Sequence, residues 1–243
     1  MVCAVKQPIA SFFKLTEAAS LTFVCYSLFR LFACLHEYPK NSASNLADTE
    51  LPIISVLLPV YHEAHMIDEL VRHVSAIDYP RHKLDVFIIC EPDDCTTIKA
   101  AQKCTAPYIH VFVTDGSGPK TKPNALNAVL PNCAGEIITV YDAEDRPDPN
   151  QLRAAACALK TDPSLAVVQA PLVYYNDEKN WLTRQFALEY NALFHVWIPF
   201  LAHLNLSFPL GGTSNHIRRT ALVSAGGWDA FNVTEDADLS FRL

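Results

Sequence analysis

Short apolar runs alternate with stretches of helical periodicity through most of this chain. The apolar runs cover residues 53–60, 84–90, 109–113, 136–141 and 166–171. Between them, apolar residues recur every three or four positions, as they do on one face of a helix. Strands separated by helices favour a mostly parallel sheet with helices on its faces. With 243 residues and 50% hydrophobic content, the chain can bury a large core, and we expect an α/β fold.

Two of the predicted helices carry start signals. Asp94 stands where it would cap a helix that runs to Lys103. Residues 148–151 supply a capping aspartate, a proline at the first helical position and a glutamine at the third. The second signal predicts a helix that begins directly after Asp148 and ends at Lys160.

Polar groups follow three of the predicted strands, at residues 61–63, 91–94 and 142–145. Ligands of parallel α/β sheets bind beyond the carboxyl ends of the strands, so we expect these groups to converge. The acidic cluster 142–145 offers hard oxygen ligands that suit Mg²⁺ or Mn²⁺, and such a cation can hold a diphosphate. Lys120 and Lys122, before a helix, suit phosphate oxygens. Each group alone could be a capping or solvated residue, but together they predict a nucleotide site.

Charge and cysteine usage narrow the class of partner. A net charge of −7 without a legible basic face argues against nucleic acid as a partner. The eight cysteines form no C-x-x-C pair and lie in or beside apolar segments, which favours reduced, buried thiols over disulfides or a zinc site. We therefore expect the functional face of the protein on the cytoplasmic side.

The N-terminal segment, 1–40, differs from the rest of the chain. Residues 18–35 are mostly apolar and carry a single charge, Arg30. Their number is close to the length that crosses a bilayer, and Arg30 lies near one end where it could reach the headgroups. A buried helix, an interfacial helix and a signal peptide are the alternatives, and the last lacks a small-residue cleavage site. We predict a transmembrane helix, in a cell (inner) membrane. Basic residues flank both ends of this helix, so its orientation in the membrane stays open. Residues 41–52 are predicted to form a polar linker.

The second half of the chain contains an aromatic segment and two glycine pairs. Residues 179–197 carry aromatic residues at helical spacing, which predicts mostly core packing; a position on a membrane surface is the alternative. The pairs Gly211-Gly212 and Gly226-Gly227 allow sharp turns or close backbone approach. The acidic segment 234–238 follows them. On its own, Asp236 reads as a residue favoured by a helix N-terminus.

Taken in order, these motifs resemble family 2 glycosyltransferases of the GT-A fold, in the membrane-embedded branch that includes cellulose synthase. The resemblance spans 53–243, which we expect to form one glycosyltransferase domain. Its motifs lie at residues 59–63, 91–94, 122–127, 142–145, 169–171, 212–213 and 234–236.

The resemblance implies a role for each motif. Asp236 would be the catalytic base, with Glu235 as a supporting neighbour. Asp142 would bind the metal, Mg²⁺ or Mn²⁺, together with Glu144 or Asp145. The residues implied for the nucleotide sugar are Pro59, Tyr61, Glu63, Glu91, Lys122, Asn127 and Asp142. The residues implied for the acceptor or a lid are Gly212, Thr213, Trp228 and Thr234.

Two features depart from the family pattern. The metal motif usually has aspartate at both ends of a three-residue span, whereas Glu144 takes the second end here and Asp145 follows; either could be the ligand. The chain also stops before the Gln-x-x-Arg-Trp motif that processive members use for the acceptor, so we expect a fragment of a longer protein.

The resemblance implies an inverting glycosyltransferase that moves a hexose from a UDP-sugar to a growing polysaccharide of the beta-glucan or exopolysaccharide type. A single carboxylate suffices as general base for such a direct displacement. The alternatives are a nonprocessive enzyme acting on a lipid or small acceptor, and a truncated, noncatalytic module that binds sugar nucleotides. The expected partners are thus a UDP-sugar, a polysaccharide or glycolipid acceptor and the membrane.

Overall fold

A computed structural model describes residues 3–35, 46–104, 106–175 and 177–243. The chain forms two compact units. One combines Met1–Lys40 with Val173–Leu206, and the other combines Asn41–Leu172 with Ser207–Leu243. The sequence predicted a single domain 53–243, whereas the structure groups 173–206 with the N-terminal helix. Part of the expected linker 41–52 lies outside the described residues.

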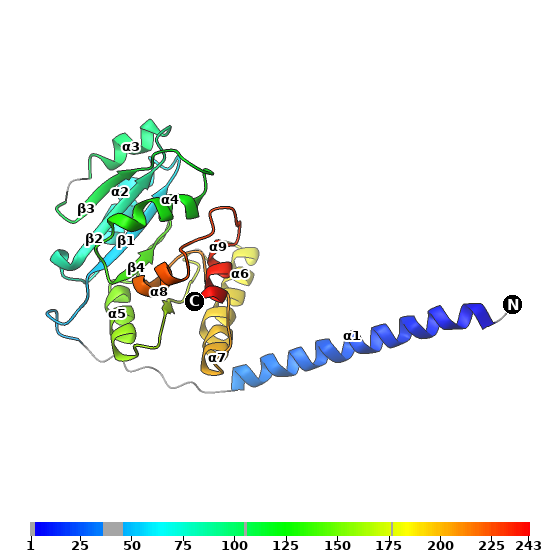
Figure 1. Cartoon of the computed structure of the whole chain (residues 1–243). Coiled ribbons are helices and arrows are strands. Elements are labelled where there is room, and N and C mark those ends of the chain that lie inside the picture. Colours follow the sequence, from blue (N-terminus) through cyan, green and yellow to red (C-terminus); the bar gives the residue numbers. More distant parts are fainter. Residues whose placement is uncertain (1–2, 36–45, 105, 176) are drawn as a thin grey trace. The chain divides into compact units, whose positions relative to one another are not determined.

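The larger unit is built on a six-stranded sheet of order β3-β2-β1-β4-β6-β5 (Figure 1). Its strands are β1 (Ile54–Val60), β2 (Leu84–Cys90), β3 (Ile109–Val113), β4 (Ile137–Val140), β5 (Val167–Gln169) and β6 (Asn215–Arg218). β1 pairs in parallel with β2 and β4, and β2 pairs in parallel with β3. β6 is antiparallel to both β4 and β5. The predicted mostly parallel α/β fold is confirmed, and the antiparallel β6 was not predicted.

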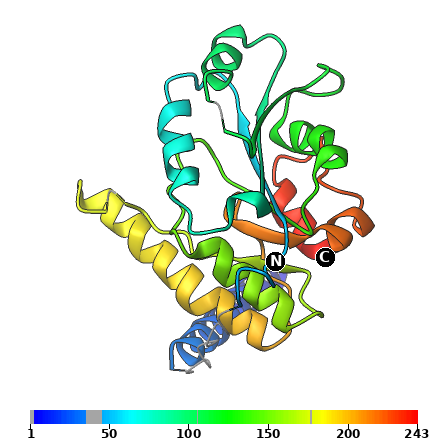
Figure 2. The ribbon, with the colours of Figure 1, turned by 90° about the vertical axis from the view of Figure 1, so that its left-hand side faces the viewer.

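Helices cover both faces of this sheet, because successive side chains of each strand point to opposite faces. Val56 and Leu58 of β1 pack into one core with α2 and α5, while Leu57 packs into a second core with α4, α8 and α9. Figure 2 shows α2 and α4 on opposite sides of the strands. The helices of this unit are α2 (Ile67–Ser75), α3 (Cys95–Ala101), α4 (Lys122–Val129), α5 (Gln151–Thr161), α8 (Arg219–Ser224) and α9 (Glu235–Arg242), with short 3₁₀ turns at Arg81–Lys83 and Leu130–Asn132.

One of the two predicted helix starts is confirmed and the other is wrong. The side chain of Asp94 caps α3 by accepting the N–H of Thr97 at 3.1 Å. α5 begins only at Gln151, after Asn150. The Asp148 carboxylate instead accepts the N–H of Asn150 at 2.8 Å, so it closes a local turn before the helix rather than capping it.

The predicted burial of the cysteines is observed for only some of them. Cys90, Cys133 and Cys157 are buried thiols, as expected. Cys95 and the helical Cys25 and Cys34 are exposed, so the expectation of burial is wrong for them. Cys95 is the first residue of α3, and Cys25 and Cys34 belong to the long N-terminal helix; none of these positions faces a core.

The smaller unit consists of α1 (Cys3–Leu35) together with α6 (Trp181–Ala192), a π-helical turn (Leu193–Trp197) and α7 (Ile198–His203). α1 is longer than the predicted span 18–35. An 18-residue stretch within residues 11–35 has a mean hydropathy of 1.7, and this is the one helix among the described residues that is long and apolar enough to cross a membrane. The aromatic segment 179–197 is not mostly core: Phe194 is buried, but Trp181 and Phe186 are exposed.

Candidate functional site

The turn after β1 is fixed by the turn after β2. His62 has a positive φ of 59°, and its N–H donates to Asp94 Oδ2 at 2.5 Å. Asp94 therefore caps α3 and holds the β1 turn at the same time. This turn orients Glu63, whose carboxylate accepts the N–H of Tyr61 at 3.3 Å. Two segments that lie 32 residues apart in sequence are thus joined at the edge where the sequence predicted a ligand.

Glu91 lies at the end of β2 and is buried. It accepts the hydroxyl proton of Thr114, which follows β3, at 2.7 Å. Next to it, Asp93 accepts from the Tyr61 hydroxyl at 3.4 Å and from Lys120 Nζ at 2.6 Å. The sequence predicted no role for Thr114 and indicated Asp93 only as a member of the polar group 91–94, because contacts across strands carry no local sequence signal.

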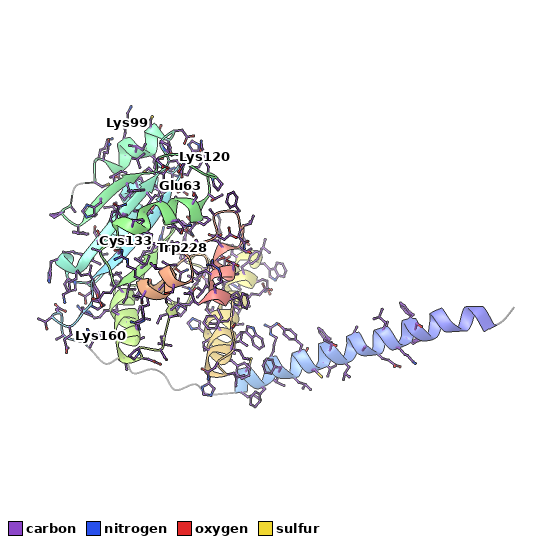
Figure 3. All side chains as sticks on the ribbon, viewed as in Figure 1. Glu63, Lys99, Lys120, Cys133, Lys160 and Trp228 are labelled. Carbon is purple, nitrogen blue, oxygen red and sulfur yellow. The ribbon has the colours of Figure 1, made fainter. Side chains whose placement is uncertain are left out.

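These turns surround a pocket of about 220 Å³. Glu63 and Lys120, labelled in Figure 3, both line it. The predicted nucleotide residues Pro59, Tyr61, Glu63, Glu91 and Lys122 are brought together here. The complete lining is Pro59, Val60, Tyr61, Glu63, Ile89, Glu91, Lys120, Thr121, Lys122 and Ala125.

Lys122 connects the pocket to the acidic cluster. It is the first residue of α4, and its ammonium group forms an ion pair with the carboxylate of Asp142 after β4. The same ammonium donates to the carbonyl of Gly212 at 2.6 Å. An ammonium group has three donors, so one remains for a ligand. Lys122 therefore links the pocket, the end of β4 and the glycine loop at one point.

The two acidic residues after Asp142 differ in their surroundings. The Asp145 carboxylate accepts the N–H of Asp142 at 2.7 Å and the hydroxyl proton of Thr213. Burial raises the pKa of Asp145, and the carboxylates of Asp142 and Glu144 raise it further. Glu144 is exposed. Asp145 thus holds the backbone of Asp142 to the loop at Thr213, while Glu144 is available to a ligand.

Negative charge is concentrated around Asp142. Burial raises the pKa of Glu63, and Glu144 and Asp142 add to the rise. Burial also raises the pKa of Glu235. The carboxylates of Asp236 and Asp142 raise this pKa further, and the ammonium of Lys122 lowers it. Carboxylates that repel one another in this way favour a nearby cation.

The glycine loop brings Asp236 to the same place. Asp236 lies in the first turn of α9, and a Cβ added to Gly212 would lie 3.4 Å from Asp236 Oδ2. Glycine at 212 therefore leaves space beside this carboxylate. Glu235 and Asp236, at the start of α9, therefore lie in the region of Lys122.

Asn127 and Trp228 form a separate contact. Both groups of the Asn127 side chain bond to the backbone of Trp228: the amide donates to its carbonyl at 2.6 Å and the oxygen accepts its N–H at 3.0 Å. Trp228 is buried in the core beside α4. Gly227 has a φ of +74°, and a Cβ there would lie 2.6 Å from the Asn127 oxygen, so glycine is required. Asn127 is placed to hold the segment before α9.

Thr234 precedes α9 as its N-cap residue. Its hydroxyl donates to the Asn232 side chain at 3.2 Å, and its N–H donates to the same oxygen at 3.0 Å. Its contacts thus stabilise the turn that leads to Glu235, at the start of the helix that carries Asp236.

The donor groups around Asp142 fit a metal ion that is shared with a substrate. Within the described parts of the chain, no group of three or more His, Cys, Asp or Glu side chains is arranged to hold a metal by itself. Mg²⁺ usually takes one or two protein carboxylates and completes its shell with water and substrate phosphates. Asp142 and Glu144 could supply such a pair, since the carboxylate of Asp145 is engaged by Thr213.

His216 of β6 is a residue that the sequence analysis missed. Its ring is completely buried, its Nδ1 lies 2.8 Å from the Thr139 hydroxyl oxygen, and its Nε2 has no partner among the described residues. Burial lowers the pKa of His216 from 6.5 to about 3. The imidazole is therefore neutral in the folded protein. His216 lies in β6, directly after the loop that contains Thr213.

This burial predicts acid sensitivity of the fold. Between about pH 6.5 and 3 the unfolded state binds the proton that the folded state excludes, so stability falls as pH falls. We expect the free energy of unfolding to fall by on the order of 1 kcal/mol per pH unit in this window, measured by urea denaturation in detergent. His216→Gln, which keeps a partner for Thr139, should weaken the dependence; an unchanged slope in that variant would contradict the assignment.

A family model described as "Glycosyltransferase like family 2" matches residues 52–243. The chain belongs to this glycosyltransferase family. Two relatives illustrate it. The family 2 chain is 29% identical over 216 residues to beta-monoglucosyldiacylglycerol synthase of Trichormus variabilis, covering 88% of this chain and 44% of that protein. It is 26% identical over 231 residues to cellulose synthase 2 of Novacetimonas hansenii, covering 93% of this chain and 14% of that protein.

A solved structure supports the fold of this family 2 chain. Mannosyltransferase PcManGT from Pyrobaculum calidifontis, in complex with GDP-Man and Mn²⁺, superposes with a TM-score of 0.68 at 24% identity, over 91% of this chain and 60% of that one. The predicted GT-A fold is thereby confirmed. The chain spans less than half the length of the two relatives named above.

Proposed function

We propose that this chain carries the donor-binding and catalytic part of an inverting glycosyltransferase that takes a hexose from a UDP-sugar. The contact of Lys122 with both Asp142 and Gly212 is the observation that carries this proposal. The positively charged ammonium of Lys122 lies between the pocket, the acidic cluster and the loop beside Asp236. In this proposal the leaving diphosphate and the acceptor meet there.

The donor side consists of the pocket and Lys122. The buried Glu91 lines the pocket together with Tyr61 and Lys120, so its carboxylate can accept an N–H group of a nucleobase. Lys120 and Lys122 can donate to phosphate oxygens. As the bond to the sugar breaks, the ammonium of Lys122 offsets the charge that develops on the diphosphate.

A divalent cation, Mg²⁺ or Mn²⁺, belongs to this proposal. When bound between Asp142 and the substrate, it supplies further stabilisation of the leaving diphosphate. Asp142 and Glu144 would hold it. Asp145, through its bonds to the Asp142 backbone and to Thr213, keeps Asp142 in position.

On the acceptor side, Asp236 acts as general base. Its carboxylate lies beside Gly212, on the loop that Lys122 holds. Removal of the proton from an acceptor hydroxyl by Asp236 permits attack on the face of the sugar opposite the diphosphate, which inverts the anomeric configuration. Glu235 and Thr234 hold the turn, and Gly212 and Thr213 border the space for the acceptor, while the buried Trp228 supports the segment before α9.

The acceptor in the first form of this proposal is a growing polysaccharide, of the beta-glucan or exopolysaccharide type. The match to cellulose synthase 2 over most of this chain supports it. A lipid acceptor is the second form, supported by the match to beta-monoglucosyldiacylglycerol synthase. In both forms α1 anchors the protein in a cell membrane, with the larger unit on the cytoplasmic side.

Transfer from labelled sugar nucleotides tests the proposal. We expect membranes that contain the protein to incorporate label from one UDP-hexose, and to require Mg²⁺ or Mn²⁺. Solvent extraction separates a labelled lipid from a labelled polymer, and so distinguishes the two acceptors. Membranes with the Asp236→Asn protein are the matched control. Absence of transfer from every UDP-hexose by folded protein would contradict the proposed function.

A further inference from the structure

The smaller unit, which contains α1, also exposes a set of large apolar side chains around the start of α6. They belong to the end of the segment before α6 and to the first turns of α6. With their exposed fractions they are Val173 (63%), Tyr175 (67%), Trp181 (74%), Leu182 (55%) and Phe186 (43%). We call these five residues the α6 patch.

The α6 patch is held in an ordered arrangement. The ring of Tyr174 packs against Phe186 and Tyr190, with ring centroids 6.2 and 4.7 Å apart, so the segment before the helix lies against α6. The side chain of Asn180 caps α6 through a capping box with Thr183. Leu182 and Phe186 are four residues apart and therefore share a helix face. The exposed apolar side chains are thus presented by a stabilised helix start.

The same unit joins α6 to the apolar helix α1. The π-helical turn and α7 continue directly from α6. Phe29 of α1 contacts the rings of Trp197 and Phe200 edge-on at 5.4 and 5.0 Å, and Tyr26 contacts Trp197 at 6.0 Å. A helix able to cross a bilayer therefore packs on the π-helical turn and α7, which continue from the helix that carries the patch.

The residue types of the patch suit the boundary of a bilayer. Trp and Tyr rings prefer the level of the headgroups, and leucine and phenylalanine gain by entering the acyl region. Lys179 and Arg184 are exposed beside them and can extend their charges to the headgroups. A solvated protein surface rarely exposes so many large apolar groups together.

We propose that the α6 patch inserts into the headgroup boundary of the bilayer that α1 crosses, so that α6 lies on the membrane surface as a second contact. The occupant of the patch is lipid. This inference extends the membrane attachment within the proposed function, and it does not depend on the donor, the metal or the base.

Tryptophan fluorescence of the whole chain in vesicles tests the inference. The vesicles contain phosphatidylcholine and phosphatidylglycerol, either unmodified or with acyl chains brominated close to the headgroup. The contribution of Trp181 is the difference between the unsubstituted chain and Trp181→Phe. We expect brominated lipid to remove most of this emission, and we expect acrylamide, a quencher dissolved in water, to have little effect on it.

A matched pair of variants locates the contact on the helix. Leu182→Trp and Asn191→Trp are each made in the Trp181→Phe background. Both original side chains are exposed on α6, but they point about 180° apart at 3.6 residues per turn. Brominated lipid should quench the tryptophan at 182, and acrylamide should quench the one at 191.

The other outcomes each overturn the inference. Quenching of Trp181 by acrylamide alone would show that the patch faces water. Protection of Trp181 from both quenchers would show that a protein surface, such as a second copy of the chain, covers it. Failure of the chain to float with the vesicles would remove both membrane contacts. None of these results bears on sugar transfer, which is measured separately with labelled donors.

Discussion

Asp236→Asn is expected to lower the rate of sugar transfer by about 10²-fold or more, the usual scale for the loss of a general base. Asparagine keeps the shape of the side chain and its acceptor for the N–H of Ala237, which the aspartate holds at 2.8 Å, but it removes the basicity. A base that acts on the acceptor contributes to the transition state and little to donor binding. The affinity for UDP should therefore stay within a few-fold of the original.

Asp238→Asn is the matched control for this substitution. Asp238 lies in the same helix, but its carboxylate is paired with Arg242 at 2.7 Å. We expect transfer close to the original rate in the control. Near-normal transfer by Asp236→Asn would show that Asp236 only stabilises the start of α9 and that another carboxylate, first of all Glu235, is the base.

Asp142→Asn is expected to remove the metal dependence of UDP binding. The substitution takes away the negative charge that would hold the cation and also the partner of Lys122. Contacts of this charged kind contribute about 1.5–3 kcal/mol each, so the affinity for UDP with Mn²⁺ should fall by on the order of 10-fold or more. Calorimetric titration of UDP, with and without Mn²⁺, measures both effects.

Asp148→Asn serves as the control for Asp142. Asp148 is exposed and closes a local turn through its bond to the N–H of Asn150, so its charge is not required at the proposed site. UDP affinity and metal dependence should be unchanged in this variant. If both are also unchanged in Asp142→Asn, Asp142 does not hold the metal, and the acidic cluster needs another explanation.

Periodicity in the sequence was sufficient for the fold class. The apolar runs predicted β1, β2, β3 and β4 within one or two residues of their observed bounds, because a buried parallel strand is apolar on both faces. The capping role of Asp94 was also predictable, since it depends on residues only three positions apart. Chain order together with these elements placed the polar turns at one edge of the sheet.

The roles of individual site residues depended on contacts between distant segments. Asn127 holds Trp228, 101 residues away, and Lys122 reaches Gly212, 90 residues away. No local pattern distinguishes such an asparagine or lysine from one that only binds a ligand. The metal, base and nucleotide assignments remain predictions that the two aspartate substitutions test.

The sequence by itself therefore determined the alternation of elements, the polar strand ends and the apolar α1, because hydrophobic periodicity and capping act over a few residues. Only the tertiary structure decided that the polar strand β6, which contains Asn215 and His216, lies between β4 and β5. Only the tertiary structure also decided that Trp181 is exposed while Phe194 is buried. The physical reason is that the burial of a side chain depends on which other segments pack against it. Those segments are distant in the sequence, so no local pattern identifies them.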